Sequence, residues 1–367
     1  MSPSAELKGR TIRLRRPSPE DVNIRFNLGR HAEIVRGFGG SFDSGDPYTL
    51  ADAQAAIRLI EDDAHAWVID AGRYIGQVRF HSIDHGDRRA ALAVGIDDPR
   101  RLGQGLGTEA VRLALSHGFR SGLHRVTVRV VAYNARAIAC YLKCGFVEEG
   151  REREAALVDG VRHDDVIMGL LAREFVSDAP GSRPVETEAA AEAGASPSFD
   201  PTEIDIRPLS VDLVDSFHHA LDTVARERRY LTFTEAPSLA HTREFVLGGQ
   251  EKGDPRVVAV AAGKVVGWCD IGRHPFRTHA HRGTLGMGVM PGFRRRGVGV
   301  RLITAALDGA WAAGLTRVEL TVYADNSAAV ALYEKVGFVR EGIVQDAVCV
   351  GGHYRDGIAM AVLRRPR

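Results

Sequence analysis

The chain of 367 residues is too long for one ordinary hydrophobic core and suits two domains of usual size. Its 44% hydrophobic and 26% charged residues are typical of globular proteins, and its formal net charge of +1 argues against a general nucleic-acid or membrane-binding surface. No apolar run approaches membrane-spanning length, and residues 1–4 lack a signal-peptide pattern. We therefore expect a cytoplasmic protein without nucleic-acid or membrane partners.

The first half of the chain predicts strands and helices framed by hairpins. Gly72 supplies the positive φ that a tight hairpin turn needs. The expected order is a strand at 11–15, a helical region, a hairpin of 66–70 and 74–80, a strand at 91–96, a glycine-rich loop, a helix with Leu106, Val111, Leu115 and Phe119 on one apolar face, a strand at 126–130, a second helix and a hairpin turning at Asp159-Gly160.

Residues 176–202 interrupt this pattern with many Pro, Gly, Ser, Ala and Glu residues and few apolar side chains. We expect a flexible linker here, between a domain at 1–175 and a domain at 203–367. The second domain repeats the order of elements: a strand at 203–207, a helical region, a hairpin of 257–261 and 265–270, a strand at 284–290, a glycine-rich loop, a helix with Leu302, Ala306, Leu307 and Trp311, a strand at 318–322, another helix and a hairpin turning at Gly351-Gly352. This alternation indicates an α/β fold with a mixed sheet.

The distinctive residues of the two halves are related by one constant spacing. Gly297 follows Gly105 by 192 residues. The same spacing relates Asn134 to Asn326, Tyr141 to Tyr333, Gly145-Phe146 to Gly337-Phe338, and Asp164 to Asp356. A register kept without a gap across such residues indicates a duplicated domain.

Each half contains a glycine-rich loop between a strand and a helix. The loop reads Gly105-Leu106-Gly107 in the first half and Gly297-Val298-Gly299 in the second. Glycines let the backbone approach an anion closely, and the free amides and dipole at a helix N-terminus favour phosphate. An ordinary strand-to-helix turn is the alternative, because neither loop has the Gly-Lys-Ser/Thr ending of a nucleoside-triphosphate loop.

An asparagine and a tyrosine stand about two helical turns apart in each half, so both side chains can face one groove. The pairs are Asn134 with Tyr141 and Asn326 with Tyr333. Helix capping by the asparagine and core packing by the tyrosine are the alternatives. Their recurrence in phase with the glycine loops favours a functional site.

With its strand, glycine loop, helix and Asn-x6-Tyr-x3-Gly-Phe pattern, each half resembles the GNAT superfamily of acyl-CoA-dependent N-acyltransferases. The second half matches better, because its loop keeps an Arg-x-x-Gly-x-Gly pattern. The resemblance implies two tandem GNAT-like domains, each an α/β unit with a mixed, mostly antiparallel sheet flanked by helices. The duplication suggests a pseudo-dimer within one chain.

The resemblance also implies acetyl-CoA as the acyl donor, with coenzyme A as product. Its cofactor-binding residues in the first domain would be Ile96, Asp97, Leu102, Gly103, Gln104, Gly105, Leu106, Gly107 and Asn134. Those in the second domain would be Val289, Met290, Arg294, Arg295, Arg296, Gly297, Val298, Gly299 and Asn326. Tyr141 and Tyr333 are the implied catalytic residues, which protonate the departing thiolate. A phenol with a pKa near 10 stays protonated at neutral pH and can do so.

Many members of the superfamily relay the amine proton through a glutamate on the strand before the loop. Neither 91–96 nor 284–290 contains a glutamate. Candidate general bases are Asp97 in the first domain, and Asp270, His279, His281 and Glu319 in the second. A solvated surface or strand-edge group is the alternative for each.

The histidines of Arg273-His274-Pro275 and His279-Ala280-His281 resemble a metal-binding tract by composition only. No third ligand has metal-site spacing, so a flexible acceptor-side loop is favoured and no metal is expected. The cysteines form no zinc pattern and are expected to be reduced thiols; they are Cys140, Cys144, Cys269 and Cys349.

These features predict an N-acetyltransferase acting on a primary amine of a small molecule, amino acid or peptide. Residues 38–48 and 229–242, with their aromatic, charged and loop-forming residues, are expected to face the acceptor. The alternative is an acyl-CoA-binding regulatory or scaffold protein with one or both domains catalytically silent. The missing glutamate favours that alternative, and the two retained tyrosines argue against it.

Overall fold

The computed structural model describes residues 6–43, 45, 47–176, 204–231, 233–275 and 279–364. The chain divides into two compact units, Met1–Glu186 and Thr187–Arg367, hereafter the first and second domains. Apart from Val176, the predicted linker at 176–202 lies outside the described residues. In the described part of the chain, no helix has the length and apolar character needed to cross a membrane.

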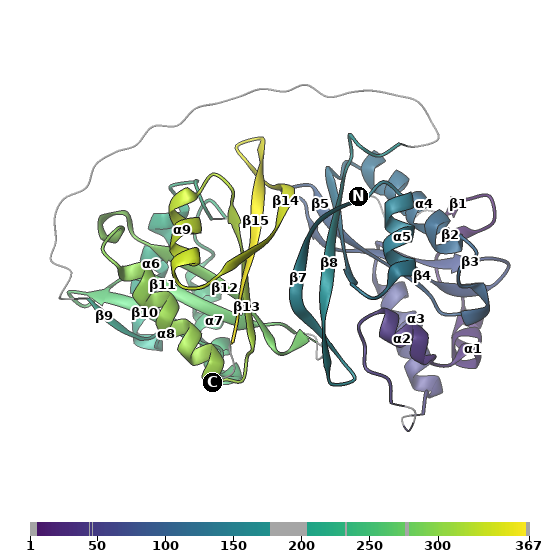
Figure 1. Cartoon of the computed structure of the whole chain (residues 1–367), viewed down its shortest axis with the longest axis horizontal. Coiled ribbons are helices and arrows are strands. Elements are labelled where there is room, and N and C mark those ends of the chain that lie inside the picture. Colours follow the sequence, from purple (N-terminus) through teal and green to yellow (C-terminus); the bar gives the residue numbers. More distant parts are fainter. Residues whose placement is uncertain are drawn as a thin grey trace. The chain divides into compact units, whose positions relative to one another are not determined.

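The first domain is a sheet with helices on both faces (Figure 1). The strands lie in the order β1-β2-β3-β4-β5-β6-β8-β7. The elements are β1 (Leu7–Lys8), β2 (Arg13–Arg15), α1 (Pro19–Leu28), α2 (Ala32–Gly37), α3 (Leu50–Asp62), β3 (Ala66–Asp70), β4 (Tyr74–Asp84), β5 (Arg89–Ile96), α4 (Leu106–Arg120), β6 (Arg125–Val131), α5 (Ala135–Lys143), β7 (Val147–Val158) and β8 (Val161–Leu171).

The second domain repeats this arrangement with one helix fewer among the described elements before its hairpin (Figure 1). Its strands lie in the order β9-β10-β11-β12-β13-β15-β14. The elements are β9 (Asp205–Pro208), α6 (Val214–Ala225), α7 (Leu239–Lys252), β10 (Arg256–Ala261), β11 (Lys264–Arg273), β12 (Arg282–Val289), α8 (Val298–Ala312), β13 (Arg317–Tyr323), α9 (Ser327–Lys335), β14 (Val339–Val350) and β15 (His353–Leu363). The predicted α/β fold of two tandem, mostly antiparallel domains is confirmed.

In each domain one described pair of neighbouring strands runs parallel, and it pairs over three residues. Arg89–Ala91 of β5 lie beside Arg125–Thr127 of β6, and Arg282–Thr284 of β12 lie beside Arg317–Glu319 of β13. Beyond these pairs the strands separate, although β5 and β12 continue along their antiparallel neighbours to their ends. One backbone edge of β5 and of β12 is therefore left open just before each glycine loop.

The helix after each glycine loop packs its predicted apolar face into the core. Leu106, Val111 and Leu115 of α4 are buried, and Phe119 packs against the same cluster. Leu302 and Ala306 of α8 are fully buried in the second domain. The periodicity of these helices was therefore sufficient to identify their buried faces.

The same two helices also bind the backbone at the start of each domain, α4 through a hydrogen-bond acceptor and α8 through a donor. Glu109 of α4 accepts hydrogen bonds from the backbone N–H groups of Arg10 (2.5 Å) and Thr11 (2.9 Å). At the corresponding position of α8, Arg301 donates from Nη2 to the carbonyl oxygen of Ile204 at 2.8 Å. The position keeps its role in both domains while its charge is reversed.

Truncating the buried face of α4 should destabilise the first domain. We expect Leu115→Ala to cost about 2–5 kcal/mol, because it removes a fully buried side chain and leaves a cavity. Leu59→Ala, at a side chain that is 66% exposed, is the matched control and should change stability by less than about 0.5 kcal/mol. Urea unfolding followed by circular dichroism measures both, and equal midpoints for the two variants would contradict the expectation.

Candidate active site

Each glycine loop turns into its helix through a left-handed residue. Gly105 caps α4 with φ of 79°, and Gly297 caps α8 with φ of 76°. Two residues earlier, Gly103 has φ of 75° and Arg295 has φ of 60°. Glycine adopts this conformation at little cost, which explains its presence at three of the four positions.

The space above both loops is open. A Cβ atom built on Gly103, Gly105 or Gly297 would meet no atom within 4 Å. The first turn of an α-helix leaves its backbone N–H groups without intrahelical acceptors, and the helix dipole adds positive potential there. Both loops therefore offer accessible N–H donors that suit an anionic ligand.

Several predicted cofactor-binding residues of the loops already contact other parts of the protein. Arg294 donates from Nε to the carbonyl oxygen of Val289 at 2.8 Å and binds both carboxylate oxygens of Glu227 at 2.9 and 2.7 Å. Gln104 donates its amide to the carbonyl oxygen of Arg100 at 2.7 Å. Leu102 ends a short 3-10 turn, with its N–H on the carbonyl oxygen of Pro99. The predicted contacts of Arg294 and Gln104 with a cofactor stay predictions.

The strand ends before the loops have one free edge. The N–H of Asp97 donates to Ile75 at 2.8 Å, and the N–H of Met290 donates to Val266 at 2.9 Å. Because backbone groups alternate in direction along a strand, those of Ile96 and Val289 face the opposite, open edge. There the carbonyl of Val289 accepts the Arg294 hydrogen bond. The backbone groups of Ile96 and the N–H of Val289 thus face an edge that no neighbouring strand covers.

The two tyrosines are buried at matching places. Tyr141 is 5% exposed and lies 5.5 Å from the ring of Phe146, and Tyr333 is 8% exposed and lies 5.7 Å from the ring of Phe338. Burial raises the pKa of both phenols above the usual value of 10. Both side chains therefore stay protonated at neutral pH, as a proton donor must.

The two asparagines cap the helices that carry these tyrosines. Asn134 accepts the N–H of Ala137 at 3.1 Å and donates its amide to the carbonyl oxygen of Gly37 at 2.8 Å. Asn326 accepts the N–H of Ala329 at 3.2 Å. Capping is thus part of their role, and their contact with a cofactor stays a prediction.

Asp97 lines a cavity of about 160 Å³ enclosed by α1, α2, α3 and the end of β5. Its carboxylate accepts a hydrogen bond from the Tyr74 hydroxyl at 2.5 Å and lies 3.5 Å from Nε of Arg25. Burial raises the pKa of Asp97 despite these partners. The Tyr48 hydroxyl in the same cavity is buried and makes no hydrogen bond with the described residues. The cavity can therefore bind a polar ligand beside a carboxylate of increased basicity.

Sequence reasoning missed Arg25, Tyr48 and Tyr74 as neighbours of Asp97. The Arg25 guanidinium lies 4.6 Å from the centre of the Tyr48 ring, although they belong to different elements. Tyr48 ends the region 38–48 that was expected to face the acceptor, and this was the only signal for it. Such neighbours depend on how α1 and α3 pack on the sheet, which local patterns do not encode.

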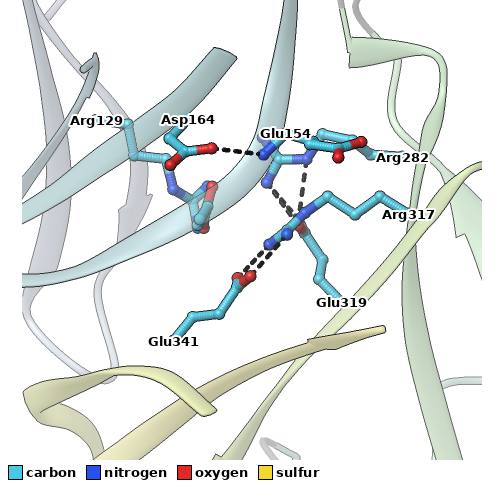
Figure 2. A network of polar contacts seen from close by, with 8 residues as sticks. Arg129, Glu154, Asp164, Arg282, Arg317, Glu319 and Glu341 are labelled. Atoms are coloured by element: carbon cyan, nitrogen blue, oxygen red, sulfur yellow. Dashed lines mark hydrogen bonds and ion pairs between the residues drawn. The ribbon is translucent and has the colours of Figure 1, made fainter. Parts of the chain in front are cut away.

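The candidate bases of the second domain differ in their surroundings. Glu319 accepts hydrogen bonds from Arg282 at 2.6 Å and from Arg317 at 2.9 Å. Figure 2 shows the Arg317 guanidinium between Glu319 and Glu341. Two arginines bind the Glu319 carboxylate, which gives this side chain a structural role between β12 and β13. Asp270, in contrast, is half-buried, and desolvation raises its pKa to about 6.

The histidine-rich stretch brings the rings of His274 and His279 within 4.9 Å of each other. Residues 276–278 between them lie outside the described part of the chain. Among the residues that the structure describes, no three His, Cys, Asp or Glu side chains form a group able to hold a metal ion. Cys140, Cys144 and Cys269 are free thiols.

Comparisons with known proteins identify the same two segments. Residues 11–147 match the family model described as an acetyltransferase (GNAT) domain, and residues 220–338 match that of the acetyltransferase (GNAT) family. The probable N-acetyltransferase YjcK of Bacillus subtilis is 31% identical over 177 residues, which cover 45% of this chain and 96% of that protein. A spermidine N(1)-acetyltransferase of Vibrio cholerae is 33% identical over 163 residues, 43% of this chain and 91% of that protein. A solved GNAT-family acetyltransferase of Streptococcus pneumoniae has a TM-score of 0.42 and 24% identity, covering 44% of this chain and 100% of its own.

Backbone strain should decide the effect of alanine in the first glycine loop. We expect Gly103→Ala and Gly105→Ala each to destabilise the domain by about 1–2 kcal/mol, because a Cβ is disfavoured at positive φ even where space is open. Gly248→Ala in α7 is the matched control: its Cβ also meets no atom within 4 Å, but φ is not positive. This control should stabilise by about 0.4–1 kcal/mol. Thermal unfolding distinguishes the two signs.

Proposed function

Because the chain belongs to the GNAT family of acetyltransferases, which use acetyl-CoA to acetylate amines, we propose that it is a cytoplasmic enzyme for a primary amine of a small molecule, amino acid or peptide. One observation carries the proposal: both domains join an accessible helix N-terminus to a buried, protonated tyrosine at the same spacing. The spermidine acetyltransferase of Vibrio cholerae supports a small amine as acceptor.

Both domains would hold acetyl-CoA through backbone groups. The amides of 104–107 and 296–299 would bind the pyrophosphate, since these residues surround the open helix N-termini. Ile96 and Val289 would pair with the pantetheine arm along the open strand edges. Arg295 and Arg296 on the second loop would add charge-assisted hydrogen bonds to phosphate.

The acetyl transfer needs one proton acceptor and one proton donor. As the amine nitrogen bonds to the acetyl carbon, the carbon–sulfur bond breaks, and the nitrogen loses a proton to a carboxylate. The departing thiolate then receives the phenol proton of Tyr141 or Tyr333. Their raised pKa keeps that proton in place until the thiolate develops, because a buried phenolate is costly.

In the first domain, the cavity beside Asp97 is the proposed acceptor site. Its carboxylate is placed at the end of β5, next to the open edge, and Tyr48 offers an unused hydroxyl. Asp97 would bind the incoming neutral amine and accept the proton that its nitrogen loses as the nitrogen–carbon bond forms. The cavity supports turnover in this domain and weakens the alternative of a silent acyl-CoA-binding module.

Acetyl-CoA binding should report on each domain separately. We expect calorimetric titration of the full chain to give two sites, and Gly105→Glu or Gly297→Glu each to remove one. The new side chain has room in the free protein but costs about 1–2 kcal/mol at positive φ, so circular dichroism must show that each variant is folded. Its carboxylate would repel the pyrophosphate. A single site in the unaltered chain would mean that one domain is a scaffold, and no binding would contradict the proposed function.

Removing both phenols should strongly reduce turnover while acetyl-CoA binding is kept. We expect Tyr141→Phe/Tyr333→Phe to lower thiol release by about 10²–10⁴-fold, the usual contribution of a proton donor, while acetyl-CoA still binds. Thiol release is measured with spermidine, mixed L-amino acids and a peptide with a free amino terminus. Tyr133→Phe, at a tyrosine that is 43% exposed, is the control and should keep full activity. Unchanged turnover in the double variant would rule out the tyrosines as proton donors.

A further inference from the structure

Asp270 of β11 lies over a glycine of the neighbouring strand. Asp270 and Gly286 of β12 are directly opposite in the antiparallel register. A Cβ atom on Gly286 would lie 3.3 Å from Oδ1 and 3.4 Å from Oδ2 of Asp270. The Asp270 carboxylate thus occupies the space that a side chain of β12 would otherwise fill at Gly286.

This position is at the edge of the gap between β12 and β13. The last pair of these parallel strands is Thr284 with Glu319, and Gly286 follows two residues later. Val289, whose backbone faces the open edge, lies three residues further. The Asp270 carboxylate is therefore next to the part of β12 along which the thioester end of acetyl-CoA would enter.

Asp270 and Tyr333 lie on opposite faces of β11. Cys269, the residue before Asp270, belongs to the core cluster that contains Tyr333. Successive strand residues point to opposite faces, so Asp270 shares the other face with Trp268. A group threaded between the separated strands would be flanked by a carboxylate on one side and a phenol on the other.

The surroundings leave Asp270 available to take up a proton. Within the described residues its carboxylate makes no hydrogen bond or ion pair. The charged groups that act on it are Arg256, which lowers its pKa, and Asp254, which raises it. Helices α6 and α7 present aromatic rings on this face, Phe217 against Trp268 and Phe245 against the Arg256 guanidinium. Burial dominates and brings the pKa to about 6.

The first domain has no such arrangement. The strand ends correspond, with Gly76 opposite Ile96 in the first domain and Gly267 opposite Val289 in the second. Counted from these pairs, Arg79 opposite Ala93 takes the place of Asp270 opposite Gly286, so a cation replaces the carboxylate and a methyl group replaces the glycine hydrogen. The first domain has its carboxylate at Asp97 instead. The pairing of Asp270 with Gly286 thus distinguishes the second domain.

We propose that Asp270 is the general base of the second domain, placed on β11 because Gly286 leaves room above β12. The inference rests on the proposed acetyl transfer. The proton of the attacking amine passes to the Asp270 carboxylate as the nitrogen–carbon bond forms, and Tyr333 protonates the thiolate as the carbon–sulfur bond breaks. The carboxylic acid then returns its proton to solvent.

The test uses the full chain with Tyr141→Phe, so that turnover reports on the second domain. We expect Asp270→Asn in this parent to lower kcat/KM by about 10²–10⁴-fold and to abolish the acid limb of its pH profile near pH 6, with acetyl-CoA binding kept. The base works only when deprotonated, so the parent should lose activity as the pH falls through this range. Asp270→Glu should restore part of the rate.

Two further variants keep the proposal testable if Asp270→Asn misfolds. Gly286→Ala should lower kcat/KM while the domain stays folded, because its methyl group displaces the carboxylate by a few tenths of an ångström. Asp254→Asn should keep the rate at neutral pH but move the acid limb to lower pH, since Asp254 raises the pKa of Asp270.

The outcomes separate this inference from the proposed function. A parent that is active with an amine, together with an Asp270→Asn variant of equal kcat/KM and unchanged pH profile, overturns the general base alone. A parent that releases no thiol, while the unaltered chain does, also overturns the general base, since the second domain then performs no transfer for a base to serve. An unaltered chain that releases no thiol with any amine of the panel overturns the proposed function as well.

Discussion

The site in each domain depends on two parallel strands that pair briefly and then separate. β5 and β6 share three residue pairs, as do β12 and β13, before the chain enters the glycine loop. Because one edge of β5 and β12 stays unpaired, its backbone N–H and C=O groups need another partner. A substrate with an amide-containing arm can supply it, and the helix N-terminus after the loop lies at the end of that edge. In the proposed site, backbone geometry would thus position the phosphate and the thioester.

Buried ion pairs lie at the end of each domain's parallel strands where the two strands are still paired. Arg125 with Glu149 in the first domain and Arg317 with Glu341 in the second repeat at the 192-residue spacing and bind through two nitrogen–oxygen contacts each. In the second domain Arg282 adds a link through Glu319, which ties the start of β12 to β13. Removing one partner of such a pair costs about 3–5 kcal/mol, since the other charge is left buried. These charges are structural, and Glu319 belongs to the same network.

The sequence was sufficient for the duplication, the order of elements, the glycine loops and the helices that bear Tyr141 and Tyr333. These features follow from local periodicity and from a repeated register. It did not reveal that Arg294 is bound by Glu227, that Asp97 lines a cavity, or that Asp270 covers Gly286. Each of these depends on contacts between segments that are tens of residues apart, and on which face of a strand meets which helix. Asp270 stood among the candidate bases, but only the cross-strand register explains its position.

The reversed charge at one helical position limits how the two repeats can be recombined. Glu109 accepts from backbone N–H groups of the turn between β1 and β2, whereas Arg301 donates to the backbone carbonyl just before β9. A chimaera that exchanges α4 and α8 would place an arginine against N–H donors in one domain and a carboxylate against a carbonyl oxygen in the other. Neither contact can form a hydrogen bond, and both leave polar groups unsatisfied. After duplication, each helix has come to match the opening backbone segment of its own domain, so the two must be exchanged together.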